Sequence, residues 1–379
     1  MTDRPPSATD VLIVGAGIAG ASLAAALAPW RRVVLAESED APGYHATGRS
    51  AAFWHETYGG AGVQPLTLAS LETLLRPDPA FSDHGFLSSR SALTVGRTSE
   101  AAAVDAFTAE FKARGVEIER MSGAALAERI PGLRPEWSEA AYEAACRDID
   151  VGGLHTAYLR AARRAGASLV TRAPLRRARR ARRAGDGWRV QLGDGEIEAA
   201  VIVNAAGAWA DHVAAACGVA PVGIQPYRRT VLQVRLGAAV PAELPLVIHV
   251  GGQFYFKGES EGRVWLSPHD ETPTTAHDVA PEDIDVAIAI ERMQSVVDWP
   301  VAAVERKWAG LRSFAPDRLP VFGPDRHEDR FVWCAGQGGF GIQTAPAIAG
   351  LLAAQLGAPA QLGAIGRIDP VPFTPSRFA

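Results

Sequence analysis

The sequence predicts an α/β fold that combines a doubly wound sheet with a second domain built on a mixed β-sheet. A strand, a glycine-rich turn, a helix and another strand follow one another within the first forty residues. Helix-like and strand-like segments then alternate, and strand-like segments dominate residues 227–266. With 379 residues, 47% hydrophobic and 21% charged, the chain has an ordinary globular composition and room for about two or three domains.

The N-terminal elements form one βαβ unit. Val11–Val14 is a continuous apolar run, which is typical of a buried parallel strand. The alanine-rich run after the glycine turn is a strong helix former that ends before Pro29, and Val33–Ala36 forms the next strand. Residues 11–30 carry no charge, but glycines interrupt them early and no basic segment precedes them, so we expect neither a membrane span nor a signal peptide.

The later elements follow from apolar periodicity and from the positions of glycine. Val104, Phe107 and Phe111 recur at helical spacing, and Gly115 follows where that helix should end. Gly-Asp-Gly turns separate short strands, which predicts an antiparallel meander over residues 169–203. The predicted helices span 101–114, 156–164, 281–297 and 345–356, and the predicted strands include 167–171, 188–192, 230–234 and 253–257.

The glycine turn has the spacing of a dinucleotide-binding motif. Gly15 permits a tight turn, Gly17 lets a pyrophosphate approach the backbone, and Gly20 allows the helix to pack closely on the strand. The free N–H groups at the start of the helix favour phosphate oxygens. Glu37, at the end of the second strand, is placed to bind ribose hydroxyls and disfavours a 2′-phosphate, hence NADP. FAD and NAD share this pattern, so it leaves the choice between them open.

Composition and motif searches argue against several other classes. The net charge is −4 and the pI is about 6.2, which gives no reason to expect nucleic acid. Seven arginines between residues 172 and 183 lack interleaved aromatics, which indicates a solvated edge. HExxH, GxxxxGK[ST] and GxSxG patterns do not occur, and we expect no metal site. Three well-separated cysteines favour a reducing compartment, so we expect a cytoplasmic protein.

Four segments resemble motifs of the FAD-dependent D-amino-acid oxidase superfamily and stand in the same order. They are Pro42–Ala52, Asn204–Trp209, Trp308–Arg312 and Gln337–Thr344. The resemblance covers nearly the whole chain and is greatest to the bacterial D-arginine dehydrogenases. It implies non-covalent FAD and the oxidative deamination of D-amino acids, with hydride transfer from Cα to flavin N5.

The resemblance also implies how the chain is divided and which residues meet the cofactor. The FAD-binding domain is expected to comprise residues 1–85, 150–222 and 322–379, and the substrate domain residues 86–149 and 223–321. A helix beginning after Thr344 would stabilise negative charge on a reduced flavin. The residues expected at the cofactor are Gly15, Ala16, Gly17, Ile18, Ala19, Gly20, Glu37, Ser38, Thr47, Arg49, Ser50, Ala51, Ala52, Leu175, Ala206, Gly207, Trp209, Gly310, Gly338, Gly339, Phe340, Gly341, Ile342, Gln343 and Thr344.

At the substrate, the resemblance implies that Arg228, Tyr255 and Arg312 hold a carboxylate. A guanidinium matches a carboxylate in a planar, two-pronged manner, and a phenol adds a further hydrogen bond. Strand alternation lets only one of Arg228 and Arg229 face inward, and the motif register favours Arg228. Two further residues, Tyr58 and Gln343, match family positions near the amino group and the flavin, so that all five are expected to be catalytic.

The expected substrate pocket consists of Phe53, His55, Ala92 and Gly339. Ala92 stands where D-arginine-preferring members carry a glutamate, and Phe53 stands where the family has a histidine. We therefore expect neutral or apolar D-amino acids to be preferred over D-arginine, because a cationic side chain would lose water without gaining a partner. Two alternatives are a sarcosine-type oxidase of secondary amines and a protein that binds flavin without turnover. The electron acceptor and the oligomeric state are left open.

Overall fold

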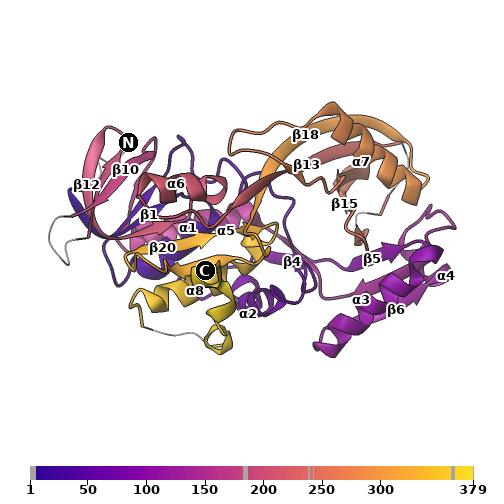
Figure 1. Cartoon of the computed structure of the whole chain (residues 1–379). Helices are drawn as coiled ribbons and strands as arrows, with labels where there is room; N and C mark the ends of the chain where they lie inside the picture. Colours follow the sequence, from indigo (N-terminus) through magenta and orange to yellow (C-terminus); the bar gives the residue numbers. More distant parts are fainter. Residues whose placement is uncertain (1–5, 182–186, 238–239, 242, 360–362, 379) are drawn as a thin grey trace.

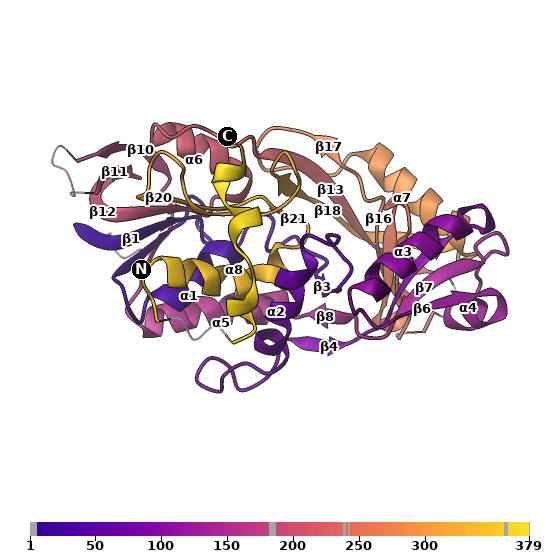
Figure 2. The same ribbon diagram turned by 60° about the horizontal axis from the view of Figure 1, so that its bottom comes forward.

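The computed structural model describes residues 6–181, 187–237, 240–241, 243–359 and 363–378. Within these residues the chain forms an eight-stranded, a ten-stranded and a three-stranded sheet. Figures 1 and 2 show two lobes side by side, with the eight-stranded sheet in one and the ten-stranded sheet in the other. The predicted α/β class with mixed sheets is confirmed.

The eight-stranded sheet has a parallel centre. β1 pairs in parallel with β2 on one side and with β12 on the other, and the last residues of β12 also pair in parallel with β20. These central strands are rich in valine, isoleucine and leucine because both faces of the sheet are covered. Its strands are β1 (Ala8–Val14), β2 (Val33–Ala36), β9 (Ser168–Val170), β10 (Leu175–Arg180), β11 (Trp188–Leu192), β12 (Gly195–Asn204), β19 (Val321–Pro324) and β20 (Phe331–Ala335).

Helices cover one face of this sheet, where α1 packs between α5 and α8, and α6 lies against the other. They are α1 (Ile18–Leu27), α2 (Gln64–Leu75), α5 (Val151–Arg164), α6 (Ala210–Ala216) and α8 (Gly341–Gln355). Sequence patterns missed α2 and α6 and started α5 and α8 several residues late. The predicted meander was wrong in one respect, because β9 pairs in parallel with β2 and only β10 to β12 are antiparallel. Arg182 and Arg183 of the arginine run lie outside the described residues.

The ten-stranded sheet is dominated by the long antiparallel pair β13 and β18, which Figure 1 shows extending away from the other lobe. Two helices, α4 (Gly123–Arg129) and α7 (Asp283–Val296), pack into its core, and α3 (Ala101–Ala113) lies against β5 to β7. The strands are β5 (Ala92–Gly96), β6 (Ile118–Ser122), β7 (Glu139–Glu143), β13 (Gln225–Leu236), β14 (Leu246–His249), β15 (Tyr255–Glu259), β16 (Arg263–Ser267), β17 (Thr272–Pro273), β18 (Val301–Phe314) and β21 (Gln337–Gly338).

A small sheet contributes the segment that carries Phe53. It consists of β3 (Phe53–Trp54), β8 (Arg147–Ile149) and β4 (Leu87–Ser89), in that order. Residues 11–30, the uncharged stretch, are divided between β1 and the ten-residue α1. Within the described ranges, no helix combines the length and apolar character needed to cross a membrane.

Candidate active site

A large cavity lies at the carboxyl ends of β1, β2 and β12 and extends to the start of α8. Its empty volume is about 1730 Å³, including space open to solvent. Ligands of doubly wound sheets bind at this end of the strands. Of the residues expected at the cofactor, those that line this cavity are Gly15, Gly17, Ile18, Ala19, Glu37, Ser38, Thr47, Ser50, Leu175, Ala206, Gly207, Trp209, Gly338, Gly339, Gly341 and Ile342.

The three glycines of the turn have separate roles. Gly15 has φ of +102°, and a side chain there would overlap the Ala205 carbonyl. A side chain at Gly20 would overlap the carbonyl of Gly15, so close packing requires glycine there. Gly17 has ordinary backbone angles, and a Cβ would meet only Thr47 Oγ1, at 3.1 Å. A side chain at Gly17 would therefore take up space at the wall of the cavity and would also require the Thr47 hydroxyl to shift by a few tenths of an ångström.

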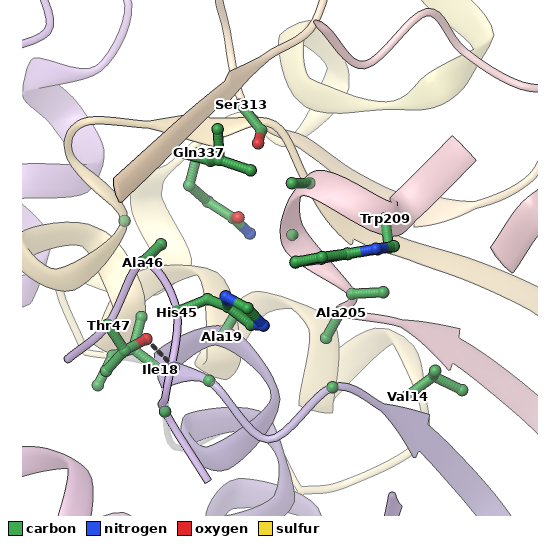
Figure 3. Close-up of a pocket in the computed structure, with 18 of the residues that line it drawn as sticks. Val14, Ile18, Ala19, His45, Ala46, Thr47, Ala205, Trp209, Ser313 and Gln337 are labelled. Carbon is green, nitrogen blue, oxygen red and sulfur yellow. Dashed lines mark hydrogen bonds between the residues drawn. The ribbon is translucent and has the colours of Figure 1, made fainter. Parts of the chain in front are cut away.

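Side chains around the turn complete this wall. Thr47 Oγ1 accepts the Ile18 N–H at 3.0 Å and thereby caps the start of α1 (Figure 3). The Glu37 carboxylate accepts the Ala16 N–H, also at 3.0 Å. His45 and Trp209 come from separate segments, and their ring centroids lie 4.6 Å apart inside the cavity (Figure 3). The two rings narrow the space available to a ligand.

His155, which no sequence pattern indicated as a site residue, supports the glycine turn through the Ala16 carbonyl. Its Nε2 lies 2.8 Å from the Ala16 carbonyl oxygen, and its ring occupies the space beside Gly43. Burial lowers the pKa of His155, which keeps the ring neutral and able to donate from Nε2. The signal was absent from the sequence because His155 follows Ala16 by 139 positions and lies on α5.

Several residues expected at the cofactor lie elsewhere. Arg49 donates to the carbonyls of Val279 and Ala309, each at 3.1 Å, and pairs with Asp278 at 2.5 Å, so it ties the segment before α7 to β18. Neither cavity described here is lined by Ala16, Gly20, Arg49, Gly310 or Thr344. Ala51, Ala52, Phe340 and Gln343 line a second, smaller cavity instead.

The second cavity adjoins the first and has an empty volume of about 370 Å³, again including open space. The two cavities share Ser50, Arg312, Gly339 and Ile342. The rest of the second cavity is lined by Ala51, Ala52, Phe53, Tyr58, Arg229, Tyr255, Phe340 and Gln343. Of the residues expected at the substrate, Tyr58, Tyr255, Arg312, Gln343, Phe53 and Gly339 are therefore brought together here.

Arg312 gives this cavity its electrostatic character. The residue is 7% exposed, and its guanidinium makes one hydrogen bond, to its neighbour's carbonyl at 3.4 Å. Among the described residues, no carboxylate forms an ion pair with it. Burial, reinforced by the positive charge of Arg229, lowers the pKa of Arg312. A buried guanidinium without an acidic partner favours binding of an anion, and a carboxylate matches its geometry.

Two further groups border Arg312. Arg229 donates to the Asp270 carbonyl at 2.8 Å and to Glu271 at 3.0 Å, which fixes its guanidinium at the cavity wall. Burial raises the pKa of Tyr255, so its phenol stays protonated and able to donate a hydrogen bond. The arrangement provides two cations and a neutral phenol around one small space.

The expectation that Arg228 rather than Arg229 faces this space is wrong. Arg228 forms ion pairs with Glu282 and, at 2.7 Å, with Asp285 at the start of α7. The register of β13 and β18 explains the difference, since Arg229 lies opposite Gly310 and Tyr227 opposite Arg312. Residues 227 and 229 therefore share a face with Arg312, whereas Arg228 points to the other face.

Ala92 and His55, two residues of the expected pocket, line neither cavity. Ala92 is buried in the cluster that also contains Phe53 and Tyr255. His55 is likewise buried, and its ring contacts Phe53 edge-on. Phe53 itself lines the cavity and is flanked by Tyr58 and Tyr255 at 5.2 and 5.8 Å between ring centroids. Among the described residues, no cluster of three His, Cys, Asp or Glu side chains is arranged to hold a metal ion.

Comparisons with known proteins identify a matching family. Residues 10–355 match the family described as FAD dependent oxidoreductase. FAD-dependent oxidoreductase domain-containing protein 1 of Bos taurus is 28% identical over an alignment of 198 positions, which covers 48% of this chain and 40% of that protein. Glycine oxidase of Pseudomonas putida is 26% identical over an alignment of 193 positions, which covers 49% of this chain and 48% of that protein. The matched region thus spans less than half of each of these relatives.

Solved structures share the fold over almost their whole length. Glycine oxidase from Geobacillus kaustophilus superposes with a TM-score of 0.82 and 23% identity, covering 98% of this chain and 99% of that one. L-Proline dehydrogenase from P. horikoshii gives a TM-score of 0.83 and 19% identity, covering 99% and 98%. The more particular resemblance to D-arginine dehydrogenases remains a prediction.

Proposed function

This chain belongs to the FAD-dependent oxidoreductase family, and we propose that it oxidises the carbon–nitrogen bond of an amino acid whose carboxylate binds between Arg312 and Arg229. The buried Arg312 guanidinium, without an acidic partner among the described residues, is the observation that supports this proposal most strongly. An amino acid carboxylate would supply the missing charge in two-pronged geometry. The Tyr255 phenol would add a hydrogen bond.

The cofactor is FAD, and the residues of the large cavity fit it. The space left by Gly17 suits a pyrophosphate, as do the N–H groups at the start of α1 other than that of Ile18, which Thr47 accepts, and Glu37 suits ribose hydroxyls. Gly338 to Ile342 and the start of α8, where the two cavities meet, would hold the flavin ring. FAD supplies the hydride-accepting chemistry when it is bound. We propose that FAD is bound non-covalently.

The chain's own residues bind and orient the substrate. With the carboxylate held at Arg312, the amino group and Cα would lie toward Tyr58 and Gly339, at the junction with the flavin cavity. Loss of hydride from Cα, with the nitrogen lone pair forming the C=N bond, yields an imino acid that water converts to an oxo acid and ammonia. We propose D-configuration for chiral substrates, with neutral side chains preferred over that of D-arginine.

Small amines such as glycine and sarcosine are the second candidate class. Two observations favour them: the four aromatic side chains that line the small cavity, and the likeness to glycine oxidase of Pseudomonas putida. Substrates of both classes carry the carboxylate. They differ only in the side chain on Cα or in the substituent on the nitrogen. A substrate panel therefore separates them.

We expect anaerobic mixing with D-alanine to bleach the flavin, with D-arginine slower and L-alanine without effect. Bleaching by glycine or sarcosine but not by D-alanine would instead favour the second class. Reduction without oxygen reports hydride transfer directly, whatever the natural electron acceptor. Admission of air after bleaching then measures whether oxygen reoxidises the flavin. If dithionite bleaches the flavin but no amino acid of the panel does, the proposal is contradicted. The chain would then be a flavin-binding protein without this activity.

Phe53→Ala is expected to favour larger substrates. Removing the ring enlarges the small cavity that Phe53 lines, so the ratio of kcat/KM for D-leucine to that for glycine should rise at least about tenfold. Loss of the buried ring also lowers stability, by roughly 3–5 kcal/mol. Phe111→Ala, in a cluster that borders neither cavity, should lose stability without changing the ratio. An unchanged ratio in Phe53→Ala would show that Phe53 does not limit substrate size.

A further inference from the structure

The short turn that carries Tyr58 is held from one side by Gln343, near the start of α8. The Gln343 amide nitrogen donates to the carbonyl oxygens of His55 at 3.3 Å and Tyr58 at 3.2 Å, and its oxygen accepts the His55 N–H at 3.2 Å. The turn is closed by the Tyr58 N–H, which donates to the His55 carbonyl at 3.1 Å. Gln343 thus fixes the backbone of the turn against α8.

Glu143, the last residue of β7, holds the same turn from the other side. Its Oε1 accepts the Glu56 N–H at 3.1 Å, and its Oε2 lies 3.1 Å from His55 Nε2. The Thr57 hydroxyl lies 3.2 Å from that ring nitrogen. Glu143 is 1% exposed. A fully buried carboxylate therefore accepts one backbone N–H of the turn and lies beside the His55 ring, which the Thr57 hydroxyl contacts in turn.

The charge of Glu143 is part of this arrangement. Burial alone would raise the pKa of Glu143, but His55, the Glu56 N–H and the Thr57 hydroxyl outweigh it and hold the pKa below its usual value. Glu143 Oε2 has no hydrogen-bond partner among the described residues, so its contact with His55 Nε2 is electrostatic, and the hydrogen bond from Glu143 to the turn is the one that Oε1 accepts from the Glu56 N–H. Hydrogen bonds to a charged acceptor are stronger than neutral ones, so the turn is held tightly.

The position of the Tyr58 hydroxyl depends on this turn. A side chain at Gly339 would overlap that hydroxyl, which therefore lies directly over Gly339, where the two cavities meet. The Tyr58 ring makes edge contacts with Phe53 and Phe340 at 5.2 and 6.2 Å between centroids. These ring contacts limit tilting of the Tyr58 ring. The distance of its hydroxyl from Gly339 is set by the position of the Tyr58 backbone.

We infer that Glu143 is a positioning residue that fixes the His55–Tyr58 turn and thereby holds the Tyr58 hydroxyl over Gly339. The inference rests on the proposed function for the contact between Tyr58 and the substrate. The contacts of Glu143 with the turn do not depend on that function. Glu143 lies opposite Ala92 in the β5–β7 pair, so the ten-stranded sheet supplies this support.

A double-mutant cycle tests the inference. Because a displacement of about 1 Å costs roughly a hundredfold in rate, Glu143→Ala should lower the limiting rate of flavin reduction about ten- to a hundredfold, with FAD content unchanged. Glu143→Gln should retain most of the rate, since an amide oxygen still accepts the Glu56 N–H. In a Tyr58→Phe background, Glu143→Ala should cost less than about threefold. Equal losses in both backgrounds would show a general structural role and overturn the inference.

A readout without turnover separates this inference from the proposed function. In protein labelled with 3-fluorotyrosine, the Tyr58 fluorine signal is assigned by its loss in Tyr58→Phe. Glu143→Ala should shift or broaden that signal, whereas Glu139→Ala should not. Glu139 lies on the same strand but pairs with Arg120 at 2.5 Å, away from the turn. An unchanged Tyr58 signal in Glu143→Ala overturns the inference, even if no amino acid reduces the wild-type flavin.

Discussion

Arg312→Met is expected to lower kcat/KM for every carboxylate substrate by roughly 30-fold to several thousandfold. Truncating one partner of a buried charge pair costs about 2–5 kcal/mol, and each 1.4 kcal/mol is about a factor of ten. Methionine keeps the length and apolar bulk of the side chain, so the loss reports the charge. Arg229 and Tyr255 remain beside the carboxylate, which is why binding is weakened rather than abolished. Steady-state kinetics on the best substrate of the panel measures the effect.

Arg306→Met is the matched control for this prediction. Arg306 lies on the same strand, β18, but is exposed and far from both cavities along the strand. Its replacement should change kcat/KM by less than about twofold, since surface substitutions of this kind have small effects. The amide of the best substrate, which lacks the carboxylate charge, should lose much less in Arg312→Met than the acid does. Equal losses for acid and amide would show that Arg312 does not bind the carboxylate.

Gly17→Val is expected to abolish FAD binding and leave a folded, colourless protein. The Gly17 backbone angles suit any residue, and a Cβ requires only a small shift of the Thr47 hydroxyl, which lies 3.1 Å away, so we expect the protein to fold with some loss of stability. The added methyl groups would occupy the space that the pyrophosphate needs. Flavin absorbance of the purified protein, together with far-UV circular dichroism, gives the result.

The control for the glycine prediction is Gly152→Val. Gly152 lies near the start of α5, where the nearest atom to a Cβ is an Asp150 oxygen at an ordinary 3.8 Å. This variant should retain FAD. If Gly17→Val also purified yellow with full FAD content, the glycine turn would not hold the pyrophosphate.

Sequence patterns predicted those parts of the site that are contiguous in the chain. The strand, glycine turn and helix at residues 11–27 are local, and so is the segment before α8, because neighbouring residues determine each turn. Short apolar spacing also placed α3 and α7 within a few residues of their true ends. In these segments the residues that determine the structure are close together in the sequence, so a local pattern is sufficient to predict it.

Side chains whose role depends on strand register could not be assigned in this way. Alternation shows that Arg228 and Arg229 face opposite ways, but not which way, because this depends on the pairing of β13 with a strand about 80 residues later. Glu143 and His155 were missed for a related reason. Each acts on a backbone segment far away in sequence, and no local spacing indicates such a contact.

The location of the two kinds of site residue has a consequence for how such a protein evolves. Arg229 and Arg312 lie on β13 and β18, which pair over twelve residues of one strand, so their positions are determined by many hydrogen bonds. Phe53 lies on a strand of two residues, and its side chain is surrounded by other side chains. Substitutions at Phe53 can therefore change substrate selectivity while the carboxylate anchor stays in place. In related proteins that share this framework, the substrate side chain that is accepted should change sooner than the requirement for a substrate carboxylate.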